Sequence, residues 1–195
     1  MVIDGLIHND DPAAAPMWMP KGSFWSQPAG EVHITAAKGN ESTAYIEIDN
    51  GPYLVKPPEE AFDTGERPVN VDPANFVWLN AAGTTWIDGT GSNTVGPKLS
   101  FLWGKPMKSS LNGTALWLPA DFRGTIAGKH ADIRAVVIDG TLDFGGDRGT
   151  SAKRMAPGSY FSSPPDVAQH ISTTKADCLL YIRSEGRYTV VAQPQ

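Results

Sequence analysis

The feature that most constrains this chain is a set of short sequence blocks that occurs twice in the same order. The paired blocks are residues 2–5 and 137–140, residues 22–28 and 158–164, His33 and His170, residues 45–46 and 181–182, and residues 51–53 and 186–188, with members 135 to 137 positions apart. A repeat of this length indicates duplicated domains rather than a solenoid of short units. The second copy extends upstream to about Val77, whereas the matching part of the first copy would begin before Met1. The sequence therefore predicts one whole domain preceded by the C-terminal half of another.

Short strand-like segments separated by turn residues run through both copies. Residues 133–138 are rich in β-branched side chains and end at Asp139-Gly140, a strong hairpin signal. Residues 44–48 alternate as a half-buried strand does, and the apolar residues 178–182 stand in the matching place of the second copy. Further strands are predicted at residues 76–79, 99–103 and 115–118. With 20 glycines, 16 prolines and no sustained helical periodicity, the chain is predicted to be all-β.

Composition excludes several classes of partner. A net charge of −5 without a basic stripe excludes nucleic-acid binding. No apolar run is long enough to cross a bilayer and residues 1–5 lack the features of a signal peptide, so no membrane association is expected. Cys178 is the only cysteine and opens an apolar run, which predicts a buried, unreactive thiol. These features are compatible with a cytoplasmic protein, and that localisation is our expectation.

One segment carries a family motif. Gly22, Pro28, Gly30 and His33 follow the spacing Gly-x5-Pro-x-Gly-x2-His. This spacing matches the second sequence motif of cupins, in which the first glycine opens a turn, Pro-x-Gly forms a tight corner, and the histidine points into the barrel. Together with the repeat, the chain resembles a bicupin from residue 2 to about residue 191.

The resemblance implies a cupin jelly-roll barrel plus a partial second cupin barrel. Residues 1–58 would be the C-terminal half of a first cupin, and residues 76–195 a complete second cupin. Residues 59–75 are polar and contain prolines, so they are interpreted as a linker.

The resemblance also implies a metal site. The other cupin motif reads Gly-x5-His-x-His, followed by a carboxylate and a closing glycine, and it supplies most metal ligands in the family. Gly124, His130 and Asp132 match it in part, with Asp132 at the second histidine position. With His170 they would form a set of two histidines and one carboxylate, which suits non-haem iron with open positions.

A second register of this motif remains open. Counted back from Gly140 as the closing glycine, Ala127 and Lys129 fall on the histidine positions and Ile133 on the carboxylate position, so the site would be lost. His33 fits its own motif but lacks the usual ligand partners within its copy, so either a neighbouring chain supplies them or the residue is a relic.

Two other polar features are given structural interpretations. His8 precedes Asn9-Asp10-Asp11 and is interpreted as a solvated turn residue. Residues 145–149 are rich in glycine, but no helical pattern follows them, so they are interpreted as a plain loop.

The cupin resemblance implies a metal-binding protein with His130, Asp132, His170 and His33 as candidate ligands of a divalent transition metal such as Fe, Mn, Zn, Ni or Cu. The first hypothesis is a mononuclear metal-dependent oxidoreductase, similar to a dioxygenase, that acts on a small organic molecule. The alternatives are a non-catalytic cupin that binds or senses a small molecule, and a metal-dependent hydrolase or isomerase, because a fold indicates a reaction only weakly. A half-barrel exposes strand edges and apolar faces, so a homodimer is also expected.

Overall fold

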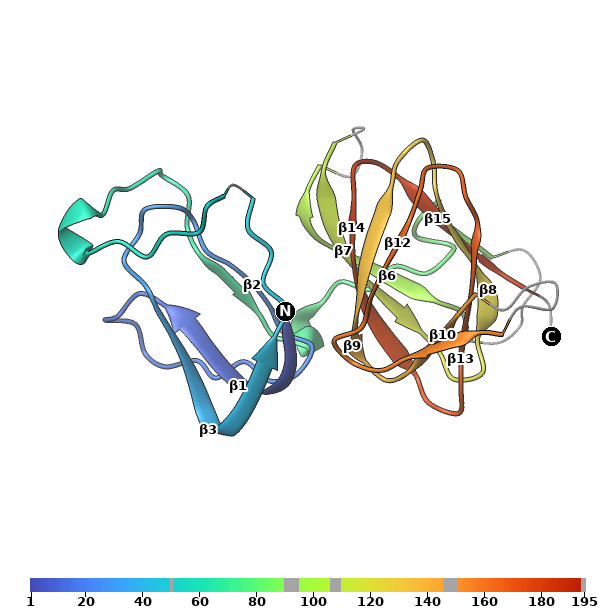
Figure 1. Cartoon of the computed structure of the whole chain (residues 1–195), viewed down its shortest axis with the longest axis horizontal. Helices are drawn as coiled ribbons and strands as arrows, with labels where there is room; N and C mark the ends of the chain where they lie inside the picture. The colour runs from blue at the N-terminus through green and yellow to red at the C-terminus, as the bar shows by residue number, and fades with distance from the viewer. Residues whose placement is uncertain (50, 90–94, 106–109, 146–150, 194–195) are drawn as a thin grey trace. The chain divides into compact units, whose positions relative to one another are not determined.

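The computed structural model describes residues 1–195 except 50, 90–94, 106–109, 146–150 and 194–195. The chain divides into two compact units, Met1–Phe76 (unit 1) and Val77–Gln195 (unit 2) (Figure 1). Nearly all regular structure in the described residues is strand, apart from two short 3-10 turns, η1 (Pro58–Glu60) and η2 (Pro73–Asn75). The prediction of an all-β protein is confirmed. No helix within the described ranges is long and apolar enough to cross a membrane.

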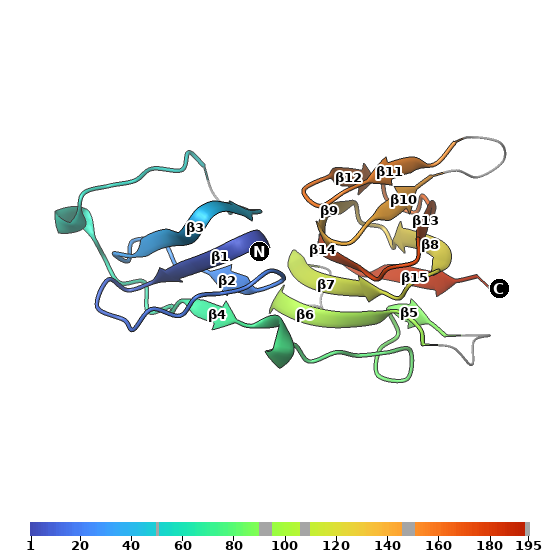
Figure 2. The same cartoon turned by 90° about the horizontal axis from the view of Figure 1, so that it is seen from below.

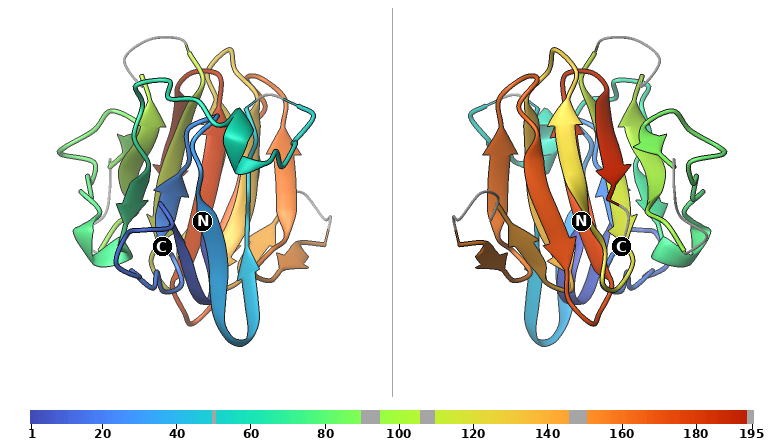
Figure 3. Two further views of the ribbon diagram at one scale, coloured as in Figure 1. Left: turned by 90° about the vertical axis from the view of Figure 1, so that its left-hand side faces the viewer. Right: turned by 90° about the vertical axis from the view of Figure 1, so that its right-hand side faces the viewer.

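Unit 2 is built from two sheets that face each other (Figure 2). One sheet has six strands in the order β11 (Lys153–Met155), β10 (Leu142–Phe144), β13 (Gln169–Thr173), β8 (Arg123–Gly128), β15 (Tyr188–Ala192) and β5 (Ile87–Asp88). The other has five strands in the order β12 (Tyr160–Ser163), β9 (Ile133–Asp139), β14 (Cys178–Ser184), β7 (Asn112–Leu118) and β6 (Lys98–Gly104). Strands distant in sequence pair within each sheet, and Figure 3 (right) shows them from another side. Unit 2 is a cupin-type jelly roll, as the sequence predicts.

The core of unit 2 lies between its two sheets. Because successive side chains of a strand point to opposite faces, alternate residues of each strand enter this core. Ile126, Leu142 and Ile171 come from the six-stranded sheet, and Leu116 and Leu180 from the five-stranded one; each is at most 2% exposed. Apolar packing across the barrel therefore holds the two sheets together.

Most predicted strands of unit 2 are found where expected. Residues 99–103, 115–118, 133–138 and 178–182 lie in β6, β7, β9 and β14. Residues 76–79 are not a strand, since only Leu79 forms a bridge, to Leu99. Cys178 is 1% exposed, and burial raises the pKa of its thiol to about 12, as expected of an unreactive cysteine. The glycine-rich stretch 146–149 lies outside the described residues.

Unit 1 contains two small sheets. β1 (Val2–Asp10) pairs with β3 (Ile34–Ala44), and β2 (Phe24–Ser26) pairs with β4 (Val69–Val71), which lies in the stretch interpreted as a linker. The strand predicted over residues 44–48 is wrong beyond Ala44, where β3 ends. Residues 45–48 carry a strand-like pattern but form no ladder in unit 1.

The sequence repeat is also a repeat of strand pairing. In three cases, a residue pair of unit 1 corresponds to a pair of unit 2 at the sequence offset of the repeat: Val2↔Ala44 with Val137↔Leu180, His8↔Ala36 with Asp143↔Ser172, and Ile7↔Met19 with Leu142↔Met155. The turn glycines agree as well, with φ of 75° at Gly5 and 77° at Gly140. Unit 1 therefore reproduces the strand pairing of the second half of unit 2.

Candidate functional site

His130 lies in the turn after β8 and makes a local contact with an aspartate. Its backbone N–H donates to Asp166 Oδ1 over 3.0 Å, and its Nδ1 lies 2.9 Å from Asp166 Oδ2. The backbone N–H of Asp166 in turn donates to the carbonyl of Gly128. These bonds, the backbone one first, lower the pKa of Asp166. The imidazole is 80% exposed, so the pair fastens two surface turns and encloses no site.

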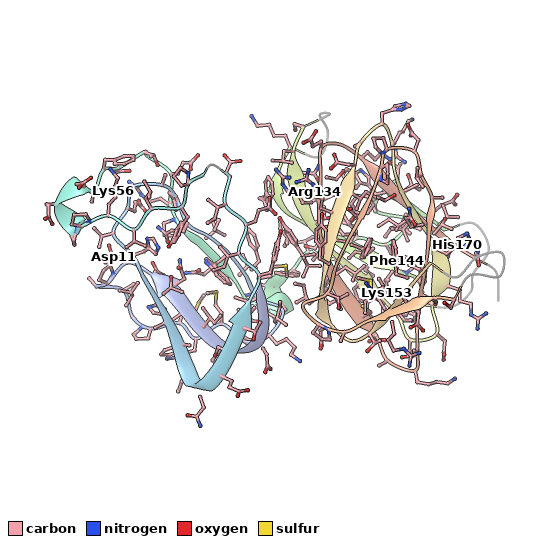
Figure 4. The ribbon with its side chains drawn as sticks, viewed as in Figure 1. Asp11, Lys56, Arg134, Phe144, Lys153 and His170 are labelled. Atoms are coloured by element: carbon pink, nitrogen blue, oxygen red, sulfur yellow. The ribbon has the colours of Figure 1, made fainter. Side chains whose placement is uncertain are left out.

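Asp132 and His170 lie apart in unit 2. Asp132 accepts a hydrogen bond from Arg134 Nε over 3.2 Å. His170 lies in β13 opposite Thr125 of β8, and Arg134 and His170 are well separated in Figure 4. Thr125 is three residues before the end of β8, so about 10 Å of strand separates the level of His170 from the turn that holds His130. The structure does not bring His130, Asp132 and His170 together.

Residues 158–170 of unit 2 correspond to the Gly22–His33 motif of unit 1. At the end of this segment, the residue that points into the barrel is Gln169. Strand alternation places His170 on the outer face of β13, because its neighbour Ile171 is buried in the core. Gln169 Nε2 donates to Ser163 Oγ over 3.3 Å. The matched strand pairing Asn9↔Thr35 and Phe144↔Ile171 makes Gln169, rather than His170, the counterpart of His33. The pairing of His33 with His170 is therefore corrected.

Gly124, His130 and Asp132 match the other cupin motif in part, and the inner positions of the barrel beside this segment are apolar. Ile126 of β8 and Ile133 of β9 are both fully buried in the core. Gly128 lies closely packed, since an added Cβ would be 2.0 Å from the Ala131 carbonyl oxygen. Within the described ranges, no group of three or more His, Cys, Asp or Glu side chains could hold a metal ion. The residues inside the described barrel do not fit a transition metal, which needs imidazole or carboxylate ligands.

His33 closes the motif of unit 1 and lies outside any such cluster. Its Nδ1 lies 3.1 Å from the carbonyl oxygen of Glu31. The corner before it requires glycine, because Gly30 has φ of 87° and an added Cβ would be 2.6 Å from Phe62. The motif therefore forms its turn in unit 1.

A polar network lies on the face of unit 1 that matches the barrel interior of unit 2. Asn9 Nδ2 donates to Gln27 Oε1 over 2.9 Å, and Thr35 Oγ1 donates to Asn9 Oδ1 over 2.7 Å. Asn70 Nδ2 donates to the carbonyl of Asn9 over 2.9 Å. Sequence reasoning missed this network, because its members are distant in sequence and no motif links them.

His8 is buried, so its interpretation as a solvated turn residue is wrong. It lies in β1 and is 2% exposed. Its Nδ1 lies 3.3 Å from the carbonyl oxygen of Met17, and its ring centroid is 5.8 Å from that of Trp18. The segment around Met17 and Trp18 covers the histidine, which the local sequence does not reveal.

Unit 1 also has an open depression of about 630 Å³. The residues that line it are Asp11, Gly30, Glu31, Val32, Ala61, Phe62, Asp63, Arg67 and Pro68. Arg67 Nη1 lies 2.8 Å from Asp63 Oδ1 and 3.1 Å from Glu31 Oε1. The Arg67 guanidinium holds the pKa of Asp63 at about 2, so this carboxylate stays ionised. With three carboxylates and one guanidinium, the lining carries an excess of negative charge.

The jelly-roll fold of unit 2 and the motif of unit 1 place this chain among the cupin-fold proteins. A family model described as "Domain of unknown function (DUF4437)" matches residues 1–191, and the chain belongs to this family. None of the curated proteins compared with the chain matches it.

Solved structures similar to this chain are cupins of low sequence identity. An RmlC-like cupin from Shewanella frigidimarina is 15% identical, with a TM-score of 0.42 over 58% of this chain and 86% of that chain. KdgF from Halomonas sp. is 17% identical, with a TM-score of 0.39 over 55% of this chain and 89% of that chain. The DMSP lyase DddQ from Ruegeria pomeroyi is 17% identical, with a TM-score of 0.44, and the match covers 57% of this chain but only 56% of the lyase.

Proposed function

We propose that this chain is a non-catalytic cupin-fold protein that binds a small, positively charged molecule in the depression of unit 1. The observation that carries the proposal is the pairing of a ligand-sized, negatively charged depression with a barrel interior whose described residues form no metal-ligand set. The volume of about 630 Å³ falls in the range of small-molecule sites. This supports the binding alternative over the metal-dependent oxidoreductase, hydrolase or isomerase.

The lack of fit to a metal rests on the side chains inside the described part of the barrel. A mononuclear centre with open positions needs about three protein ligands. In unit 2, the inner positions beside the two segments that correspond to the cupin motifs carry Ile126, Ile133 and Gln169. None of these side chains has an imidazole or a carboxylate group. The imidazole of His130 faces Asp166 on the surface. A site of His130, Asp132, His170 and His33 therefore remains a prediction from the resemblance.

The chemistry of the depression favours a cation. Arg67 is engaged by Asp63 and Glu31, so its charge is already neutralised, and the carboxylate of Asp11 adds to the remaining negative charge. Phe62 lines the depression and is 58% exposed, so its ring is accessible to a cation. Carboxylates near an aromatic ring attract an ammonium group and repel an anion.

The binding proposal predicts a charge-dependent affinity. NMR titration of the wild type with tetramethylammonium chloride is expected to shift the resonances of residues that line the depression, whereas sodium acetate at equal ionic strength shifts none of them. Asp11→Asn is expected to weaken tetramethylammonium binding by about threefold to tenfold, because it removes one negative charge from the lining. Its amide oxygen can still accept the hydrogen bond that the Ala13 N–H now donates to Asp11 Oδ1.

Asp72→Asn is the matched control. Asp72 Oδ1 accepts from the N–H of Ala74, two residues on, as Asp11 does from Ala13, but Asp72 does not line the depression. This variant is expected to bind tetramethylammonium as the wild type does. Equal binding of acetate and tetramethylammonium, or resonance shifts confined to unit 2, would contradict the proposed function.

A further inference from the structure

Arg67 already occupies two of the carboxylates that line the depression of unit 1. Its Nη1 donates to Asp63 Oδ1 over 2.8 Å and to Glu31 Oε1 over 3.1 Å, and its Nη2 donates to Asp63 Oδ2 over 3.1 Å. Nη1 also donates to the carbonyl oxygen of Glu66 over 2.7 Å. Among the described residues that line the depression, Arg67 carries the one positive charge. A guanidinium of this chain therefore takes the place that a cationic ligand would take.

The two carboxylates are also held by bonds that do not involve the arginine. The N–H of Phe62 donates to the carbonyl of Gly30 over 3.0 Å, which ties the segment of Asp63 to the segment of Glu31. Asp63 Oδ1 also accepts a hydrogen bond from the N–H of Gly65 over 2.7 Å. These bonds remain when the arginine side chain leaves. The carboxylates therefore keep their spacing for another cation of the same shape.

The ion pairs of Arg67 lie at the surface, where they are easily exchanged. The side chain of Arg67 is 64% exposed and that of Asp63 is 62% exposed, whereas that of Glu31 is 21% exposed. Exposed ion pairs contribute little to stability, because water and salt screen them and because ordering a long side chain costs entropy. A ligand that binds the same carboxylates therefore has only weak contacts to displace.

We propose that Arg67 is a built-in competitor for this site and that the ligand that replaces it carries a guanidinium group. The two carboxylates accept three hydrogen bonds from two nitrogens of one guanidinium. A planar fork of donors provides this arrangement, whereas an ammonium is a single point charge. On binding, the carboxylates exchange one guanidinium for another and Arg67 turns into solvent. This inference rests on the proposed function and names the chemical class of its ligand.

NMR titration of the full chain with methylguanidinium chloride tests the competition in the wild type, Arg67→Lys and Arg67→Gln. Lysine keeps the positive charge but loses the fork, so a pure charge effect would leave the affinity of Arg67→Lys at that of the wild type. Competition predicts that Arg67→Lys binds methylguanidinium about threefold more tightly than the wild type, and Arg67→Gln at least about tenfold more tightly. Tetramethylammonium has no N–H donor and is expected to bind each protein more weakly than methylguanidinium. Far-ultraviolet circular dichroism of both variants is expected to stay that of the wild type, because the side chain is exposed.

Arg154→Lys is the matched control, since Arg154 holds both oxygens of Asp143 over 2.9 and 3.1 Å but lies in unit 2. It is expected to bind methylguanidinium as the wild type does. If the wild type binds tetramethylammonium but neither Arg67 variant binds methylguanidinium more tightly than the wild type, the competition is overturned and the proposed function stands. Tighter binding of tetramethylammonium than of methylguanidinium overturns the ligand class. Binding of neither cation to any of these proteins overturns both the inference and the proposed function.

Discussion

Ile182→Ala is expected to lower the free energy of unfolding of unit 2 by about 2 to 5 kcal/mol. Ile182 lies in the middle of β14, is 0% exposed, and belongs to the core between the two sheets. Truncation removes apolar contacts from both sheets and leaves a cavity that paired strands on either side cannot close. Urea unfolding followed by tryptophan fluorescence measures the change.

Val191→Ala is the control for this prediction. Val191 lies in β15 of the same unit but is 37% exposed, so its truncation is expected to cost less than about 1 kcal/mol. Equal destabilisation by both variants would show that the core does not lie between the sheets as described.

Gly140→Ala is expected to destabilise unit 2 by about 2 to 4 kcal/mol. Gly140 has φ of 77°, which costs an L-residue about 1 to 2 kcal/mol. An added Cβ would also lie 2.1 Å from the carbonyl oxygen of Asp177 and 2.9 Å from Cys178 Cα, so the backbone of the neighbouring strand must move. The same urea titration measures the loss.

Gly158→Ala separates the two causes. Gly158 has φ of 84°, but an added Cβ would meet no atom within 4 Å, so this variant carries the conformational cost alone. It is expected to destabilise unit 2 by about 1 to 2 kcal/mol. If Gly158→Ala cost as much as Gly140→Ala, close packing at the turn would not be the reason for glycine at position 140.

Local patterns predict much of the fold. Runs of β-branched and apolar residues mark β6, β7, β9 and β14, because each of these strands buries at least one face. The repeat of sequence blocks predicts a repeat of structure, and the matched strand pairing of the two units agrees with it. Tyr45 exchanges two backbone hydrogen bonds with Met1, but the strand-like pattern of residues 46–48 is not matched by a ladder within unit 1.

The candidate site is harder to predict, because it depends on which face a residue occupies. A shift of one position along a strand moves a side chain from the inside of the barrel to the outside. Residue type pairs His170 with His33, whereas strand register gives the inner position to Gln169. The depression of unit 1 joins residues from position 11 to position 68, and no sequence motif reports such a surface.

The metal content of the purified protein tests the central claim most directly. The protein is to be produced with Fe, Mn, Zn, Ni and Cu all supplied, and the metal bound per chain is measured by atomic emission for the wild type and for His170→Ala. The account predicts far less than one metal ion per chain in the wild type and no further loss in the variant, because the described barrel interior offers no ligand set. One tightly bound metal ion per chain that is lost in His170→Ala would contradict it and would establish the metal centre that the cupin resemblance implies.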